Sequence, residues 1–239
     1  MVIYAIALPW VLMVGMKVIL FGATGMVGQG VLRECLLDPD VDSVLAIGRS
    51  ATGQQQSKLR EIVRLDLFDY SAIENEFCGF DACFFCLGVS SAGMPEDKYR
   101  RITYDLTLTA ARFLARLNSD LTFIYVSGMG TDSSGNSRTM WARVKGETEN
   151  ALLQTPFKAA YMFRPGAIVP LHGIASKTKV YRVFYALTGP LLPLLNRWFP
   201  KYVTTTEQMG RAMLKVAKDG WPKHVLETTD IQEVVGSIG

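Results

Sequence analysis

The stretch Val18-Ile19-Leu20-Phe21-Gly22-Ala23-Thr24-Gly25-Met26-Val27-Gly28 decides the fold of this chain. An apolar run typical of a buried strand leads into glycines spaced three residues apart, and a helical pattern follows. Glycine lets the backbone turn sharply and lets a pyrophosphate approach it, while a helix N-terminus offers free N–H groups and partial positive charge. The segment therefore predicts a nucleotide site; the alternative is a structural turn. The expected contacts are Gly22, Thr24, Gly25, Met26, Val27 and Gly28.

Outward from this segment, short apolar runs alternate with helical patterns, which is typical of βαβ units and a parallel sheet. The patterns predict strands at 17–21, 44–47, 62–65, 82–87, 121–126, 159–163 and 225–228, and helices at 26–37, 98–117, 140–153 and 208–218. A capping box, Thr204-x-x-Glu207, is expected to begin the last helix.

We therefore predict an α/β protein with a doubly wound parallel sheet of the Rossmann type. Residues 16–239 would form one nucleotide-binding domain, because single α/β domains commonly reach the 239 residues of this chain. Within it, residues 166–222 are interpreted as a small C-terminal cap over the strand ends, where ligands bind in such sheets.

Composition narrows the class of partner and the compartment. The net charge is only +3, and no basic stripe with interleaved aromatic residues is evident, so we expect no nucleic acid partner. Cys83 and Cys86 have CxxC spacing, but residues three apart on a strand point to opposite faces, which favours buried free thiols. With only two histidines, we expect no metal site, and free thiols indicate a reduced, cytoplasmic location.

Two apolar segments raise the question of membrane association. Residues 1–15 form an uncharged N-terminal extension that Pro9 interrupts, and a spanning helix needs about 20 apolar residues. We therefore interpret it as an extension, with Met16 as an alternative start and a membrane anchor as the less favoured alternative. Residues 177–201 mix basic and apolar side chains, which fits a lid or homodimer surface, with an interfacial helix as the alternative.

The end of the second expected strand bears on cofactor choice. An acidic residue there would bind the ribose 2′-OH of NAD, whereas an arginine accommodates the 2′-phosphate of NADP. The chain reads Gly48-Arg49-Ser50, so Arg49 and Ser50 favour NADP, with NAD as the alternative. A solvated arginine without a ligand is the other interpretation of Arg49.

Several motifs together resemble the extended and atypical short-chain dehydrogenases/reductases. The glycine spacing is G-x-x-G-x-x-G, Ser127 ends the fifth expected strand, and Lys145-Gly-Glu-Thr-Glu149 and Phe163-Arg-Pro-Gly166 follow. The layout is most similar to the Tat-interacting oxidoreductase-like proteins. The resemblance implies that Ser127 binds the substrate oxygen and that Lys145 holds the nicotinamide ribose. It also places Asp66 and Leu67 at the adenine, and Leu87 and Gly88 along the cofactor.

The catalytic motif of that family departs from its pattern at one position. The family has a tyrosine four residues before the lysine, on the same helix face, and this chain has Trp141. Tryptophan carries one N–H donor and no accessible acid–base chemistry. The resemblance thus implies an NADP-dependent oxidoreductase or epimerase-like enzyme on an unknown small substrate. The alternative is a non-catalytic NADP(H)-binding redox sensor. Four tyrosines are interpreted as core or surface residues rather than replacements: Tyr99, Tyr104, Tyr125 and Tyr161.

Overall fold

A computed structural model of the chain describes residues 15–174 and 200–238, and within them a seven-stranded parallel sheet forms the centre of the fold. The strand order is β3-β2-β1-β4-β5-β6-β9, and every neighbouring pair is parallel. The predicted doubly wound Rossmann-type sheet is therefore confirmed. The strands are β1 (Met16–Phe21), β2 (Val41–Gly48), β3 (Leu59–Val63), β4 (Ala82–Phe85), β5 (Thr122–Val126), β6 (Ala159–Arg164) and β9 (Val225–Glu227).

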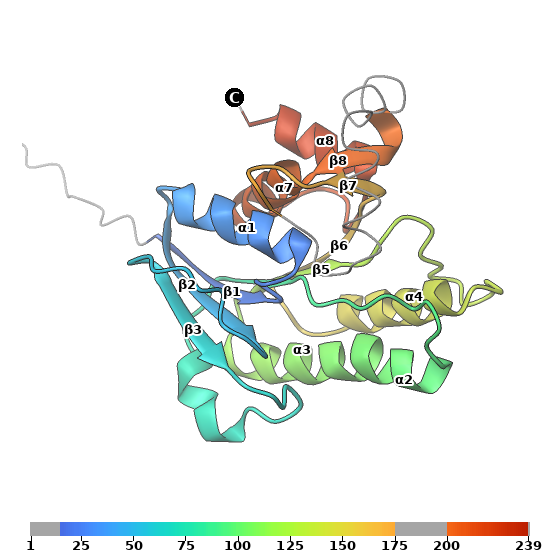
Figure 1. Cartoon of the computed structure of the whole chain (residues 1–239), viewed down its shortest axis with the longest axis horizontal. Helices are drawn as coiled ribbons and strands as arrows, with labels where there is room; N and C mark the ends of the chain where they lie inside the picture. Colours follow the sequence, from blue (N-terminus) through green and yellow to red (C-terminus); the bar gives the residue numbers. More distant parts are fainter. Residues whose placement is uncertain (1–14, 175–199, 239) are drawn as a thin grey trace, which may run out of the picture.

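Helices cover both faces of the sheet (Figure 1). Helices α1 (Met26–Leu37), α7 (Thr206–Asp219) and α8 (Thr228–Gly236) lie on one face, and α3 (Leu106–Leu117) and α4 (Met140–Leu153) on the other. Side chains of β1 alternate accordingly: Val18 and Leu20 pack against α1 and α7, while Ile19 and Phe21 pack against the α3 side. Burial on both faces explains why the central strands read as continuous apolar runs.

The chain winds outward in one direction through β1, β2 and β3 and then crosses over to β4, on the other side of β1. The carboxyl ends of β1 and β4 therefore lie side by side where the strand order reverses. In open parallel sheets, ligands bind in the crevice outside such a reversal. The fold thus places the glycine-rich turn after β1 in the position where a nucleotide is expected.

Helix α7 packs closely along α1, although the sequence assigned its residues to the cap. A Cβ added at Gly30 would lie 2.6 Å from the Cβ of Thr206, and one added at Gly210 would lie 2.6 Å from the Cγ of Glu34. The two glycines thus let the helices approach, and α7 belongs to the helix layer beside the sheet. The described cap residues also form a short parallel pair, β7 (Ala167–Val169) with β8 (Val203–Thr205), and a 3-10 turn, η4 (Pro200–Tyr202). The boundaries proposed for the cap stay a prediction.

Several local predictions differ from the structure. Strand β2 begins at Val41, three residues before the expected 44–47, and β3 spans Leu59–Val63 instead of 62–65. The expected helix 98–117 begins two residues earlier, as α2 (Glu96–Arg100), and passes through a π-helical turn (Arg101–Asp105) before α3. The expected capping box is wrong by one residue, because Thr205 and not Thr204 is the N-cap of α7 and forms the box with Gln208. The Thr205 hydroxyl accepts a hydrogen bond from the Gln208 backbone N–H at 3.0 Å, and the Thr205 N–H donates to the Gln208 side chain at 3.1 Å.

The last expected strand is also shorter than predicted, and a helix follows it that the sequence did not predict. Strand β9 ends at Glu227, and α8 begins at Thr228. Only Ile231 and Val234 provide fully buried apolar side chains in α8, a pattern too short to separate a helix from a strand by periodicity. A further 3-10 helix, η1 (Ser71–Phe77), precedes β4.

The described residues also bear on the thiols and on the apolar segments. Cys83 packs on the α3 side and Cys86 against the opposite core, as expected of a strand, and both are free thiols. Within residues 15–174 and 200–238, no helix has the length and apolar character needed to cross a bilayer, and no group of acidic, histidine or cysteine side chains is placed to hold a metal ion. Most of the N-terminal extension and of the proposed lid (1–14 and 175–199) lies outside the described residues.

Candidate nucleotide and substrate site

The glycine-rich turn brings the end of β1, the start of α1 and the exit of β4 into contact. Gly22 has φ +83°, and a Cβ there would lie 2.8 Å from the carbonyl carbon of Cys86. A Cβ at Gly28 would lie 2.1 Å from the Gly22 carbonyl oxygen. Gly25 is the N-cap of α1, and its N–H donates to the Gly22 carbonyl at 2.9 Å. Glycine at the first and third positions is therefore a packing requirement of the turn.

The N-terminus of α1 is left open for an anion. Gly25, as the residue before the helix, provides no side-chain cap, and the first turn contains no acidic residue. The first N–H groups of a helix have no intrahelical partner, so those of Met26 and Val27 point out of the turn. At the exit of β4, a Cβ added at Gly88 would meet no atom within 4 Å. Open space and unused donors at this strand reversal fit the pyrophosphate of a dinucleotide.

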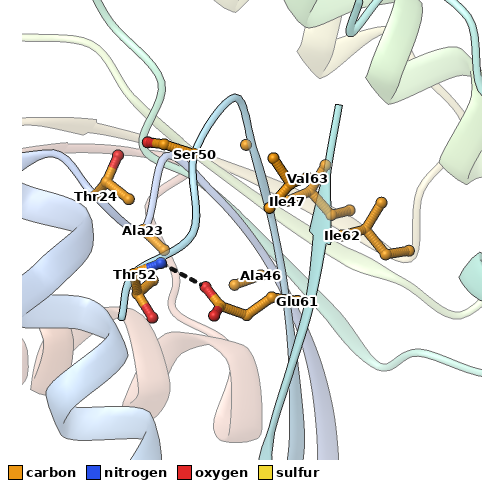
Figure 2. A pocket seen from close by; sticks show the side chains of 10 residues that line it. Ala23, Thr24, Ala46, Ile47, Ser50, Thr52, Glu61, Ile62 and Val63 are labelled. Carbon is orange, nitrogen blue, oxygen red and sulfur yellow. Dashed lines mark hydrogen bonds between the residues drawn. The ribbon is translucent and has the colours of Figure 1, made fainter. Parts of the chain in front are cut away.

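The end of β2 forms a small polar recess beside the turn. Figure 2 shows Ala23 and Thr24 near Ala46 and Ile47 of β2 and Glu61 of β3. The space that these residues line is about 10 Å³, near the minimum that a water molecule needs. Glu61 of β3 lines this recess, and its carboxylate accepts a hydrogen bond from the Thr52 N–H at 2.7 Å. The sequence alone does not single out Glu61, because a charged residue in a short strand resembles a solvated surface residue. Its place in the recess follows from the pairing of β3 with β2, in which Glu61 lies opposite Ala46.

Arg49 and Ser50 lie at the exposed end of the same strand. Among the described residues, Arg49 makes no hydrogen bond or ion pair, so its guanidinium is available to a ligand. The backbone of Arg64 lies nearby, because its backbone N–H donates to the Gly48 carbonyl at 2.9 Å. No local sequence pattern indicates Arg64, since the pairing of β2 with β3 is what brings it next to the end of β2.

The residues expected at the adenine take up a turn after β3. The Asp66 carboxylate accepts a hydrogen bond from the Phe68 N–H at 2.8 Å, and Asp66 itself is exposed. Leu67 is buried, and Leu87 packs partly against the same core. Asp66 therefore shapes its own turn and still presents polar atoms to solvent beside β3.

Lys145 of α4 reaches the end of β5. Its ammonium donates to the carbonyl of Ser127 at 2.8 Å and to that of Val126 at 3.4 Å, and it lies 5.4 Å from the centre of the Tyr125 ring. Burial lowers the pKa of Lys145 to about 8, an effect that the nearby charge of Glu149 partly opposes. The structure thus brings together Lys145 and Ser127, the two residues that the family resemblance assigns to one site.

The Ser127 hydroxyl is directed to a buried carboxylate. It donates to Oε1 of Glu149 at 2.5 Å, and Glu149 is fully buried. Arg164, at the end of β6, donates from Nε to both Glu149 oxygens at 3.0 and 3.2 Å and from Nη2 to Oε2 at 2.5 Å. Glu149 and Arg164 both stand in motifs of the sequence, but the motifs predict no role for either residue. Their salt bridge joins α4 to β6, and local patterns do not reveal such a contact.

Trp141 takes the place of the expected tyrosine, one helical turn before Lys145. Its half-buried ring would lie 3.5 Å from a Cβ added at Gly130. The four tyrosines weighed in the sequence analysis take part in other contacts or are buried. Burial raises the pKa of Tyr99 and of Tyr125, the Tyr161 hydroxyl accepts a hydrogen bond from the Trp221 N–H at 3.0 Å, and Tyr104 lies beneath the Arg100 guanidinium, 4.4 Å from its ring centre.

Fold and site together define the class of this protein as a Rossmann-type dinucleotide-binding protein, with the glycine turn at the strand reversal. The chain belongs to the NAD dependent epimerase/dehydratase family, whose model matches residues 18–147. The resemblance to short-chain dehydrogenases/reductases drawn from the motifs is thereby confirmed.

Relatives and solved structures agree with this membership. The chain is 30% identical over 159 residues to "Protein fmp52, mitochondrial" of Emericella nidulans, which covers 64% of this chain and 66% of that protein. It is 28% identical to "Protein HTATIP2" of Rattus norvegicus, over 64% of this chain and 63% of that protein. The match thus spans just under two thirds of each relative's length. The carbonyl reductase Sniffer of D. melanogaster has the same fold, with a TM-score of 0.62 at 12% identity over 90% of this chain and 97% of that one.

The expected cytoplasmic location is wrong by comparison with these relatives. Similar proteins from Emericella nidulans, Candida albicans, Scheffersomyces stipitis and Eremothecium gossypii are all named mitochondrial. The expectation rested on free thiols, which a reducing mitochondrial interior would preserve equally well. Thiol content therefore does not separate the two compartments.

Proposed function

We propose that this protein is an NADP(H)-binding oxidoreductase of the short-chain dehydrogenase/reductase type that acts on a small hydroxyl or carbonyl compound. The observation that carries the proposal is the glycine turn, whose open helix N-terminus lies at the strand reversal, next to the strand β2 that Arg49 follows without a partner among the described residues. The turn would take the pyrophosphate, and Arg49 with Ser50 would take the 2′-phosphate. Asp66 and Leu67 would contact the adenine, and Leu87 and Gly88 would border the cofactor.

The residues at the end of β5 would hold the reacting groups. A bound nicotinamide cofactor supplies or accepts hydride, and this chain orients the ligand beside it. Lys145 is fixed by the carbonyls of Val126 and Ser127, which leaves its third N–H for a ribose hydroxyl. Ser127 would contact the substrate oxygen. Gly128 follows it with room for a ligand, since a Cβ added there would meet no atom within 4 Å.

A second candidate function is a redox sensor that binds NADP(H) without turnover. Trp141 favours it, because the position that supplies the family's proton donor holds a side chain without accessible acid–base chemistry. Loss of a general acid typically costs about 10²–10⁴-fold in rate. Both candidates share the same cofactor site and differ only in whether hydride transfer follows binding.

The test is a titration of the purified protein with NADPH and NADH, followed by tryptophan fluorescence. We expect tighter binding of NADPH, and Arg49→Ala should weaken it by about 10- to 100-fold, the value of a charge-assisted hydrogen bond. Arg112→Ala, which removes an exposed arginine from α3, is the matched control. Absence of binding of either cofactor would contradict the proposal, and equal binding of both would refute the assignment of Arg49.

A further inference from the structure

The direction of the Ser127 hydroxyl carries an inference about the ligand. A serine hydroxyl has one proton to donate and lone pairs that accept. The Ser127 oxygen lies 2.5 Å from Oε1 of Glu149 and 3.3 Å from the carbonyl oxygen of Phe163. A carboxylate and a carbonyl can only accept, and the shorter distance assigns the hydroxyl proton to Glu149.

Glu149 is held as a charged acceptor. Its carboxylate is fully buried, and the guanidinium of Arg164 donates to both of its oxygens. Because both oxygens accept N–H donors from a guanidinium, which stays protonated in proteins, the contact has the geometry of an ion pair. Arg164 also contacts Glu227 at 3.2 Å, and the Ser133 hydroxyl donates to Oε2 of Glu149 at 3.2 Å. Five hydrogen bonds from three donor residues therefore orient this carboxylate.

The backbone of Ser127 is fixed as firmly as its side chain. Its N–H donates to the Phe163 carbonyl at 2.8 Å, which continues the pairing of β5 with β6. Its carbonyl accepts from Lys145 at 2.8 Å. Turning the hydroxyl proton toward a ligand would leave a buried carboxylate with one donor fewer, which is unfavourable in a site of low polarity.

We propose that Glu149 is a positioning residue that makes Ser127 a hydrogen-bond acceptor toward the ligand. A ligand at Ser127 must then supply the proton of that hydrogen bond. An alcohol can do so and a ketone cannot, so the Ser127 contact selects a hydroxyl group over a carbonyl. This inference rests on the proposed function, because it takes Ser127 to face the substrate.

The direct test is neutron diffraction from crystals of the full chain exchanged into deuterated buffer. We expect the deuterium of Ser127 to point at Oε1 of Glu149. A deuterium directed at the Phe163 carbonyl or away from both acceptors would overturn the proposal. So would a deuterium on Glu149 that points at Ser127, since the serine would then be free to donate.

A binding test addresses the ligand itself and uses the protein with NADP bound. Matched pairs such as cyclohexanol and cyclohexanone, or 1-phenylethanol and acetophenone, are compared by saturation-transfer NMR. For pairs with a detectable member, we expect the alcohol to bind about tenfold more tightly, the value of one hydrogen bond. Ser127→Ala should remove that preference. Ser133→Ala, which removes another hydroxyl donor to Glu149, should retain it.

The outcomes separate this inference from the proposed function. Failure of NADPH to bind would refute the proposed function before any ligand is tested. Binding of NADPH together with an equal or stronger affinity for the ketones would refute only the role of Glu149, as would a preference that survives in Ser127→Ala. If no pair binds detectably, the neutron map alone decides the proposal. Thermal unfolding of each variant confirms that it is folded.

Discussion

Substitution of the second and third glycines of the turn by alanine should separate cofactor binding from folding. At Gly28, the new Cβ would lie 2.1 Å from the Gly22 carbonyl oxygen, so α1 must move away from β1 by roughly 1 Å to restore a normal contact. Such overpacking costs about 1–3 kcal/mol. For a chain of this size, that corresponds to a fall in melting temperature of about 2–12 °C.

Gly25 offers the contrasting case. Its Cβ would meet only the Gly22 carbonyl oxygen, at 3.3 Å, and its φ of −79° suits any residue. Alanine is a poorer residue than glycine before a helix, which costs about 0.5–1 kcal/mol. The second glycine of such turns permits the backbone to approach the pyrophosphate. We therefore expect Gly25→Ala to stay folded and to lose NADPH affinity by about tenfold or more, since a methyl group displaces a phosphate contact.

The assay pairs thermal unfolding with NADPH titration for both variants. Gly236→Ala, at the end of α8, is the control, because its Cβ would meet no atom within 4 Å. Wild-type NADPH affinity in a folded Gly25→Ala would refute the placement of the pyrophosphate at this turn. An undiminished melting temperature in Gly28→Ala would refute the packing argument.

Four further predictions concern residues of α4 near the end of β5. The pKa of Lys145 is lowered to about 8, so its ammonium loses its charge as pH rises through 8. The affinity for NADPH should therefore fall between about pH 7 and 9. A Lys145→Met variant that kept this pH dependence would contradict the assignment of Lys145 to the cofactor ribose. Because the folded pKa lies below that of the unfolded chain, burial of Lys145 destabilises the fold at neutral pH, and this cost should diminish between about pH 8 and 10.5, as chemical denaturation of wild type and Lys145→Met would measure. Trp141→Tyr should raise the turnover rate in a screen of alcohols and ketones, by up to the roughly 10²–10⁴-fold that a general acid typically contributes. A variant that remains inactive would favour the redox sensor. Glu149→Ala leaves Arg164 without its buried partner and should lower the free energy of unfolding by about 3–5 kcal/mol, measured by thermal unfolding. The control Glu233→Ala removes an exposed carboxylate and should change the melting temperature little.

Local sequence patterns were sufficient for the central sheet and the cofactor turn. Val18 to Gly28 carries its own information, because a buried strand, a tight turn and an open helix N-terminus are all properties of consecutive residues. The same holds for the spacing of Trp141 and Lys145, since residues four apart on a helix share a face. Helix α8 escaped prediction because only two of its apolar residues are fully buried.

Only the tertiary structure shows which polar groups of the site are hydrogen-bonded to one another. Ser127 and Glu149 are separated by 22 residues and Ser127 and Phe163 by 36, so no local pattern states which atom receives the serine proton. Arg64 reaches Gly48 only because β3 pairs with β2, and α7 joins the helix layer only because Gly30 and Gly210 let it approach α1. Periodicity encodes which face of an element is buried, whereas the partners of a polar group depend on which elements the fold brings together. The sequence by itself thus determined the class of fold and the glycine-rich turn where we propose the nucleotide, and tertiary packing determined the hydrogen bonds that Ser127, Glu149 and Lys145 make.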